Sequence, residues 1–205
     1  MTSPGSVGRD ERLRLFLALQ LPEHVVEALA DWQGRHLSGR IGRIRRIVPP
    51  GNLHVTLAFL GSRPAHELDS ICAVLAESAA AVAPPLLGGG SYRETRSVGM
   101  LVLTETTGNG TLLAARLHGE LAGLGVYEPE RRPWLPHVTV LRYRERPRLS
   151  PPPPELPEFA PSGAAAFLSR LHPSGAVYEV LESFPLNRQN RSLNIRRSLN
   201  IRRMR

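Results

Sequence analysis

Two copies of one short phrase hold the residues of this 205-residue chain that could do chemistry. His54-Val55-Thr56 lies in its first third and His137-Val138-Thr139 past its middle, each within an apolar run. Successive side chains of a strand point to opposite faces, so the imidazole and the hydroxyl of each copy point the same way. Two such strands side by side would place two imidazoles and two hydroxyls around one small anion. The repeat therefore predicts an acid, a base and a phosphate cradle.

Phosphodiester cleavage needs these groups. A base activates the attacking oxygen, an acid protonates the departing one, and donors bind the non-bridging oxygens. Imidazole suits both proton roles because its unperturbed pKa is about 6.5. In-line displacement puts base and acid on opposite sides of phosphorus, which favours one histidine from each copy. The scheme needs no cofactor and no metal, and two histidines without a Cys, Asp or Glu at ligand spacing are too few ligands for zinc.

Either copy alone would more often be a packed or surface histidine than a functional one. Two copies in matching contexts change this balance, because a polar pair on the apolar face of two separate strands is costly to bury without partners. The other histidines have no repeated partner and are expected to be solvated. They are His24, His36, His66, His118 and His172.

The elements that must position the two copies alternate between strand and helix patterns. Helices are expected from Glu23, from near Ser62 and Pro64, and from Asn109, which can act as a cap. Strands are expected at Leu13 to Leu19, Ile44 to Val48, Leu53 to Leu60, Leu86 to Glu94, Val98 to Thr104, His137 to Tyr143, Ala166 to Leu171 and Val177 to Phe184. The proline-rich stretch 147–161 is expected to be an extended surface connection. This order predicts an α+β protein with two similar halves.

The high net charge belongs largely to the end of the chain. All 26 basic residues are arginine, and without the seven in residues 188–205 the formal charge falls from +8 to +1. Anion binding by the body must therefore come from local arginines. One such cluster immediately precedes the first motif: Arg40, Arg43, Arg45 and Arg46.

Three segments are expected along the chain. Residues 1–12 form a flexible N-terminus, 13–187 a single domain, and 188–205 an arginine-rich tail that repeats six residues and is poorly ordered. The alternative is that the tail binds RNA. Truncation at Asn187 would then reduce the affinity for RNA and the salt dependence of binding. The first residues lack an apolar leader, no apolar run is long enough to span a membrane, and Cys72 has no partner for a disulfide. A cytoplasmic location is therefore expected.

Several stretches resemble one known family. Val48 to Gly61 resembles its first signature and Arg132 to Arg142 its second, while Phe16 to Pro22 resembles its first strand and Phe167 to Leu186 its last two. The family is the two-histidine phosphoesterases, and within it the bacterial RNA 2′,3′-cyclic phosphodiesterases, also described as 2′-5′ RNA ligases. The resemblance covers nearly the whole body. Val140 replaces the more usual leucine and Trp134 lies where phenylalanine is frequent, and neither change removes a chemical group.

The resemblance implies a bilobal α+β fold, with two similar antiparallel-sheet lobes, helices outside and an active-site cleft between them. It also implies hydrolysis of an RNA 2′,3′-cyclic phosphate to a 2′-phosphomonoester. Carried over, His54 would be the proton donor and His137 the proton acceptor. Thr56 and Thr139 would bind the phosphate oxygens, and Arg142 would add a charged donor.

Other functions fit the same residues. The motifs address only the phosphate, so the substrate could instead be a 2′-5′ linkage or another small cyclic diester. A module that binds RNA ends without turnover is a further alternative, although a binder needs no acid and base. Few aromatic candidates for stacking on bases exist beyond Tyr92, Trp134 and Tyr143. This small number argues against sequence-specific binding of long RNA. The partners expected are RNA ends or small cyclic nucleotides, with no membrane, and the chain is expected to be a monomer.

Overall fold

The structure is a computed structural model that describes residues 11–38, 45–173 and 175–186. In chain order its elements are β1 (Arg12–Gln20), α1 (Glu23–Leu37), β2 (Arg45–Ile47), the 3-10 turn η2 (Pro50–Asn52), β3 (His54–Pro64), the 3-10 turn η3 (Ala65–Glu67), α2 (Leu68–Ala81), β4 (Leu87–Glu94), β5 (Val98–Glu105), α3 (Asn109–Gly123), β6 (His137–Tyr143), β7 (Gly163–His172) and β8 (Gly175–Phe184). The repeated tail, Arg40 and Arg43 lie outside the described residues.

All the described strands belong to one antiparallel sheet. Its order is β4-β5-β6-β3-β1-β7-β8, and β2 pairs with β6 beside this path. The two motif strands, β3 and β6, are neighbours at its centre. They pair at only one position, Val55 with Val138, after which β2 takes over the same edge of β6. The sheet therefore consists of two halves joined at the motifs, which confirms the predicted two-lobed α+β arrangement.

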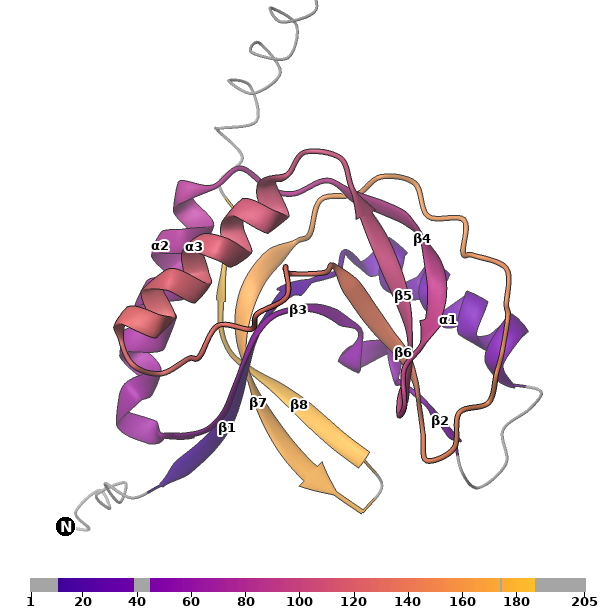
Figure 1. Cartoon of the computed structure of the whole chain (residues 1–205), viewed down its shortest axis with the longest axis horizontal. Helices are drawn as coiled ribbons and strands as arrows, with labels where there is room; N and C mark the ends of the chain where they lie inside the picture. Colours follow the sequence, from indigo (N-terminus) through magenta and orange to yellow (C-terminus); the bar gives the residue numbers. More distant parts are fainter. Residues whose placement is uncertain (1–10, 39–44, 174, 187–205) are drawn as a thin grey trace, which may run out of the picture.

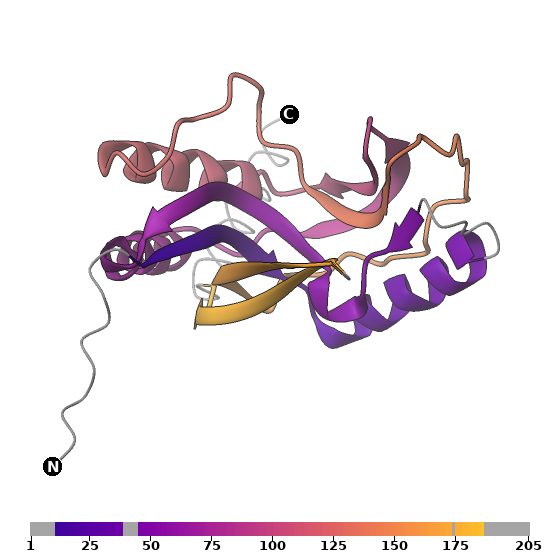
Figure 2. The ribbon, with the colours of Figure 1, turned by 90° about the horizontal axis from the view of Figure 1, so that it is seen from below.

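Helices cover each half from outside. Figure 1 shows α2 and α3 side by side over the half that contains β1, β3 and β7, and contacts of α2 with β7 and of α3 with β3 agree. Helix α1 lies at the other end of the molecule, as Figure 2 also shows. It packs on the second half, where the ring of Trp32 contacts that of Tyr92 on β4 with 6.2 Å between centroids. No helix among the described residues is long and apolar enough to cross a membrane.

Both faces of strand β1 are buried, which explains why its sequence is apolar without alternation. Leu15, Leu17 and Leu19 point into the main core together with residues of the helices. Phe16 and Ala18, on the opposite face, form a second buried cluster with residues of β7. A strand buried on both faces needs apolar side chains at every position. The second cluster forms the floor of the site described below.

One predicted helix start and one predicted helix cap are wrong, although α3 does begin at Asn109. Strand β3 runs through Ser62 to Pro64 because this stretch pairs with the beginning of β1, so α2 begins only at Leu68. Asn109 does not cap α3. Its amide donates instead to the carbonyl of Pro84, and the carboxylate of Glu105, at the end of β5, accepts from the backbone N–H groups of Gly110 and Thr111. A side chain from the preceding strand thus takes the capping role, and local sequence preference could not reveal it.

The proline-rich connection is more buried than predicted. Its residues form no strand apart from a single bridge between Phe159 and Leu87, as expected for prolines. However, Leu156 and Phe159 belong to the main core. The backbone carbonyl of Pro152 also accepts a hydrogen bond from the Trp32 indole at 2.8 Å. The connection therefore fastens α1 to the second half of the sheet.

Candidate active site

His54 is the first residue of β3, and only Leu53 separates it from the Pro50–Asn52 turn. Its Nδ1–H donates to the carbonyl of Asn52 at 2.8 Å, a bond that fixes the ring. The side-chain amide of Asn52 in turn donates to the carbonyl of Ala176 on β8 at 2.9 Å. The turn is thereby fixed to the β7–β8 hairpin. The other ring nitrogen of His54, Nε2, is left free to accept or donate a proton.

Aromatic rings surround His54. The centroids of Phe16, Tyr178 and Phe167 lie 4.8, 5.4 and 5.9 Å from that of the imidazole. The pKa of His54 is lowered from 6.5 to about 4, and burial is the largest cause. The hydrogen bond to the carbonyl of Asn52 opposes the shift in part, whereas Arg142 and His137 contribute to it. His54 is therefore neutral near pH 7 when no ligand is bound.

His137 repeats this arrangement from the other half of the sheet. It is the first residue of β6, and its Nδ1–H donates to the carbonyl of Leu135 at 2.9 Å. In both motifs the histidine therefore donates to the carbonyl two residues before it and leaves Nε2 free. The motifs are equivalent in local geometry, although only His54 lies among aromatic rings.

A pocket of about 380 Å³ opens over the two motif strands. His54, Thr56, Thr139 and Arg142 line it, so the structure brings together four of the five residues singled out for chemistry. His137 is not part of the lining, but its charge acts on His54 and it lies beside the pocket on the strand of Thr139. Arg142 is exposed, and its guanidinium lies 3.5 Å from the hydroxyl of Tyr178, which accepts from it.

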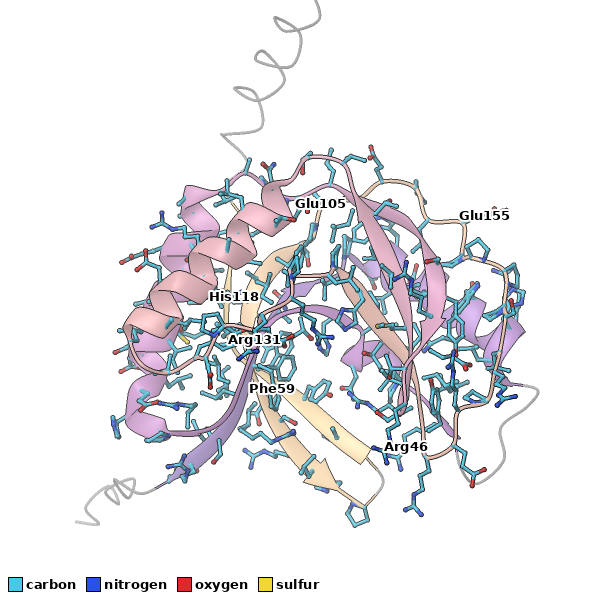
Figure 3. All side chains as sticks on the ribbon, in the orientation of Figure 1. Arg46, Phe59, Glu105, His118, Arg131 and Glu155 are labelled. Carbon is cyan, nitrogen blue, oxygen red and sulfur yellow. The ribbon has the colours of Figure 1, made fainter. Side chains whose placement is uncertain are left out.

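The pocket has a positive lining and no acid. Its arginine and histidine members are Arg14, Arg46, Arg142, His54 and His172, and none of its lining residues is Asp or Glu. Arg46 belongs to the arginine cluster identified before the first motif, and it lies on β2 (Figure 3). Its guanidinium lies so close to Gly175 that a Cβ there would collide with it, and the φ of +126° at Gly175 also favours glycine. The site is built for an anion.

Several functional positions differ from those expected. None of the predicted stacking residues, Tyr92, Trp134 and Tyr143, lines the pocket, and Phe16, Phe59 and Tyr178 do so instead. The sequence did not identify Phe16 as a pocket residue, because the uniformly apolar run of β1 does not indicate which face of the strand the helices cover. One histidine expected to be solvated is not: His118 is partly buried and contacts the carbonyl of Leu57 through Nε2 at 2.8 Å. His172 is exposed, as expected, and also lines the pocket. Among the described residues, no group of three or more His, Cys, Asp or Glu side chains is placed to hold a metal ion.

An antiparallel sheet whose two central strands each carry a His-x-Thr pair, with His54 and both threonines lining one anion pocket, defines the class of the protein as a two-histidine phosphoesterase. The sequence comparisons agree. Residues 19–101 match the family described as LigT like Phosphoesterase. A Thermus thermophilus protein named RNA 2′,3′-cyclic phosphodiesterase is 34% identical over 85% of this chain and 90% of its own length. One of the same name from Escherichia coli is 30% identical over 70% of this chain and 79% of its length.

Solved structures give the same result. A crystal structure of a Thermus thermophilus protein is 34% identical and superposes with a TM-score of 0.71, covering 85% of this chain and 98% of that one. The structure of Escherichia coli LigT complexed with 3′-AMP is 26% identical with a TM-score of 0.71, covering 86% and 99%. This chain therefore belongs to the LigT-like, two-histidine phosphoesterase family.

Proposed function

We propose that this protein hydrolyses RNA 2′,3′-cyclic phosphodiesters to 2′-phosphomonoesters. The observation that carries the proposal is the paired geometry of the site: two anchored histidines with free Nε2 atoms, beside an acid-free pocket that contains both threonines. The names of the relatives from Thermus thermophilus and Escherichia coli support this substrate class. The expected substrates are RNA ends or small cyclic nucleotides.

The proposed reaction is an in-line displacement at phosphorus. His137 accepts a proton from water as the water oxygen bonds to phosphorus, and His54 gives a proton to the 3′ oxygen as its bond to phosphorus breaks. Thr56, Thr139 and Arg142 donate to the non-bridging oxygens, whose negative charge increases in the transition state. The 2′ oxygen keeps its phosphorus, so the product is a 2′-phosphomonoester. The scheme requires no groups other than these two histidines, two threonines and one arginine.

The test combines two variants with product analysis. His54→Ala and His137→Ala should each reduce hydrolysis of a nucleoside 2′,3′-cyclic phosphate by at least about a hundredfold, since each removes one proton transfer. His24→Ala, which removes an exposed imidazole from α1, is the matched control and should keep the wild-type rate. Near wild-type turnover in either motif variant would refute the mechanism. A 3′-phosphate product would refute the direction of ring opening.

Two alternative functions would give different experimental results. Turnover of a 2′-5′ linked dinucleotide in preference to the cyclic phosphate would favour ligase-type chemistry at the same site. Binding of RNA ends without turnover across the pH range would indicate a binding module. The predicted cytoplasmic location and monomeric state stay predictions.

A further inference from the structure

The pocket contains more positive charge than one cyclic phosphate requires. Such a phosphate is a monoanion, and Thr56, Thr139 and Arg142 already supply donors for it. Arg14 and Arg46 line the same pocket without being part of this set. Among the described residues, none of these three arginines forms an ion pair with a carboxylate, because the five ion pairs involve other arginines. Uncompensated cations facing one cavity indicate a ligand with a second negative charge.

Arg14 is held in place for such a role. Its guanidinium donates through Nη1 to the hydroxyl of Ser169 at 3.2 Å and lies 4.8 Å from the centre of the Phe59 ring. Stacking on an aromatic ring and a bond to a neutral hydroxyl fix the direction of an arginine without neutralising it. Phe59 itself is 50% exposed, so this pair borders the open side of the pocket.

The register of the sheet gives the distance from the phosphate cradle. Thr56 pairs with Ala18 on β1, while Phe59 pairs with Phe16, two residues further along. Two residues of a strand span about 6.6 Å. Because the Arg14 guanidinium lies over Phe59, it is displaced from the Thr56 position by about this step along the sheet. One ribose can bridge such a separation between two phosphates.

We propose that Arg14, oriented by Ser169 and Phe59, binds a second phosphate of the substrate, the one on the 5′ side of the nucleotide that carries the cyclic phosphate. This inference rests on the proposed function and specifies its substrate class further. The preferred substrate is then a nucleotide with phosphate at both ends of its ribose. A free 5′-phosphate and the internucleotide phosphate of an RNA chain have this chemistry in common.

Three substrates with the same terminal nucleoside test the proposal. They are the nucleoside 2′,3′-cyclic phosphate, the same compound with a 5′-phosphate, and a dinucleotide that ends in the cyclic phosphate. In the wild type, kcat/KM should be about tenfold higher for both substrates with a second phosphate, because each makes one more charge-assisted contact. Arg14→Gln should remove this advantage, so it should reduce kcat/KM about tenfold more for the two substrates with a second phosphate than for the first substrate. Arg14→Lys should retain part of it.

Arg12→Gln is the matched control. Arg12 precedes Arg14 by two residues on β1, but its guanidinium bonds to Ser62 and does not line the pocket. It should preserve the tenfold advantage, which separates contact at the pocket from the general loss of one positive charge. An equal loss on all three substrates in Arg14→Gln would overturn the proposal, as would no wild-type preference. A preference for the dinucleotide alone would also overturn it, since the second nucleoside would then be responsible.

The two proposals fail in different ways. Absence of wild-type turnover on all three substrates would overturn the proposed function and this inference with it. Turnover of the first substrate without any gain from a second phosphate would overturn this inference only.

Discussion

Val55 and Val138 face each other across β3 and β6, and each is the middle residue of a His-Val-Thr motif. Both valines are fully buried, so the flanking histidines and threonines point to the other face of the sheet. Because the strands are antiparallel, this register brings His54 toward Thr139 and Thr56 toward His137. Each imidazole therefore approaches the hydroxyl of the other motif. Acid, base and phosphate donors are assembled by one pairing between strands that lie 83 positions apart in the sequence.

Trp134 reinforces this junction, and its indole N–H should be important for activity. The indole Nε1 donates to the carbonyl of Thr56 at 2.9 Å, which links the segment before the second motif to the first motif. Trp134→Phe keeps an aromatic ring and removes the bond. We expect a loss of about 1 kcal/mol in the free energy of unfolding and a fall in kcat of about tenfold, because the motifs lose a contact that sets their spacing.

A matched tryptophan serves as the control for this prediction. The indole of Trp32 also donates to a backbone carbonyl, that of Pro152 at 2.8 Å, but away from the motifs. Trp32→Phe should reduce the free energy of unfolding similarly and leave kcat unchanged. Urea unfolding and steady-state kinetics on a nucleoside 2′,3′-cyclic phosphate measure both quantities. Equal effects of the two variants on kcat would show that Trp134 is only a packing residue.

The sequence predicted most of the fold because local patterns carry it. The strand and helix over Arg12–Gln20 and Glu23–Leu37 follow directly from an apolar run and a helical spacing, and both agree with the structure. Failures occurred where a residue outside the element itself decides. Pairing with β1 extends β3 to Pro64, and Glu105 supplies the cap of α3.

The site was predictable in its repeated part only. The equal spacing within the two motifs identified the histidines and threonines, since a strand puts alternate residues on one face. Arg14 and Phe16 could not be identified in the same way. Their place in the pocket depends on which face of β1 the helices leave open, and Tyr178 reaches the pocket only through the pairing of β8 with β7.

The low pKa of His54 should make stability depend on pH. In the folded protein this pKa is lowered to about 4, whereas the unfolded chain has the ordinary value of 6.5. Between these values the unfolded chain binds more protons, so the free energy of unfolding rises with pH. The contribution is fully present above pH 6.5 and is lost as the pH falls toward 4. A pKa shift of this size corresponds to about 3 kcal/mol. This figure is an upper bound, because part of the ring is exposed to solvent.

His54→Gln should remove this dependence. The difference in free energy of unfolding between wild type and variant should shrink as the pH is lowered from about 7 to about 4, as measured by urea unfolding. His24→Gln removes an exposed imidazole and should show no such change relative to the wild type. A constant difference between wild type and His54→Gln over this range would contradict the lowered pKa.

The same low pKa makes the proposed donor role of His54 measurable. A proton donor must carry its proton in the complex, but His54 is neutral above about pH 4 when the site is empty. A bound phosphodiester anion places negative charge beside the ring and so raises the pKa of His54. Binding should therefore take up a proton near neutral pH. A 2′,3′-cyclic phosphate is a suitable ligand because it does not itself titrate in this range.

Calorimetry in buffers of different ionisation enthalpy measures this uptake, and His137→Gln prevents turnover during the titration. At about pH 6 this variant should take up a substantial fraction of one proton per ligand bound. The double variant His54→Gln/His137→Gln should take up none, which assigns the proton to His54. Binding by His137→Gln without proton uptake would mean that His54 stays neutral in the complex. Its free Nε2 would then act as the proton acceptor, and the roles of the two histidines would be exchanged.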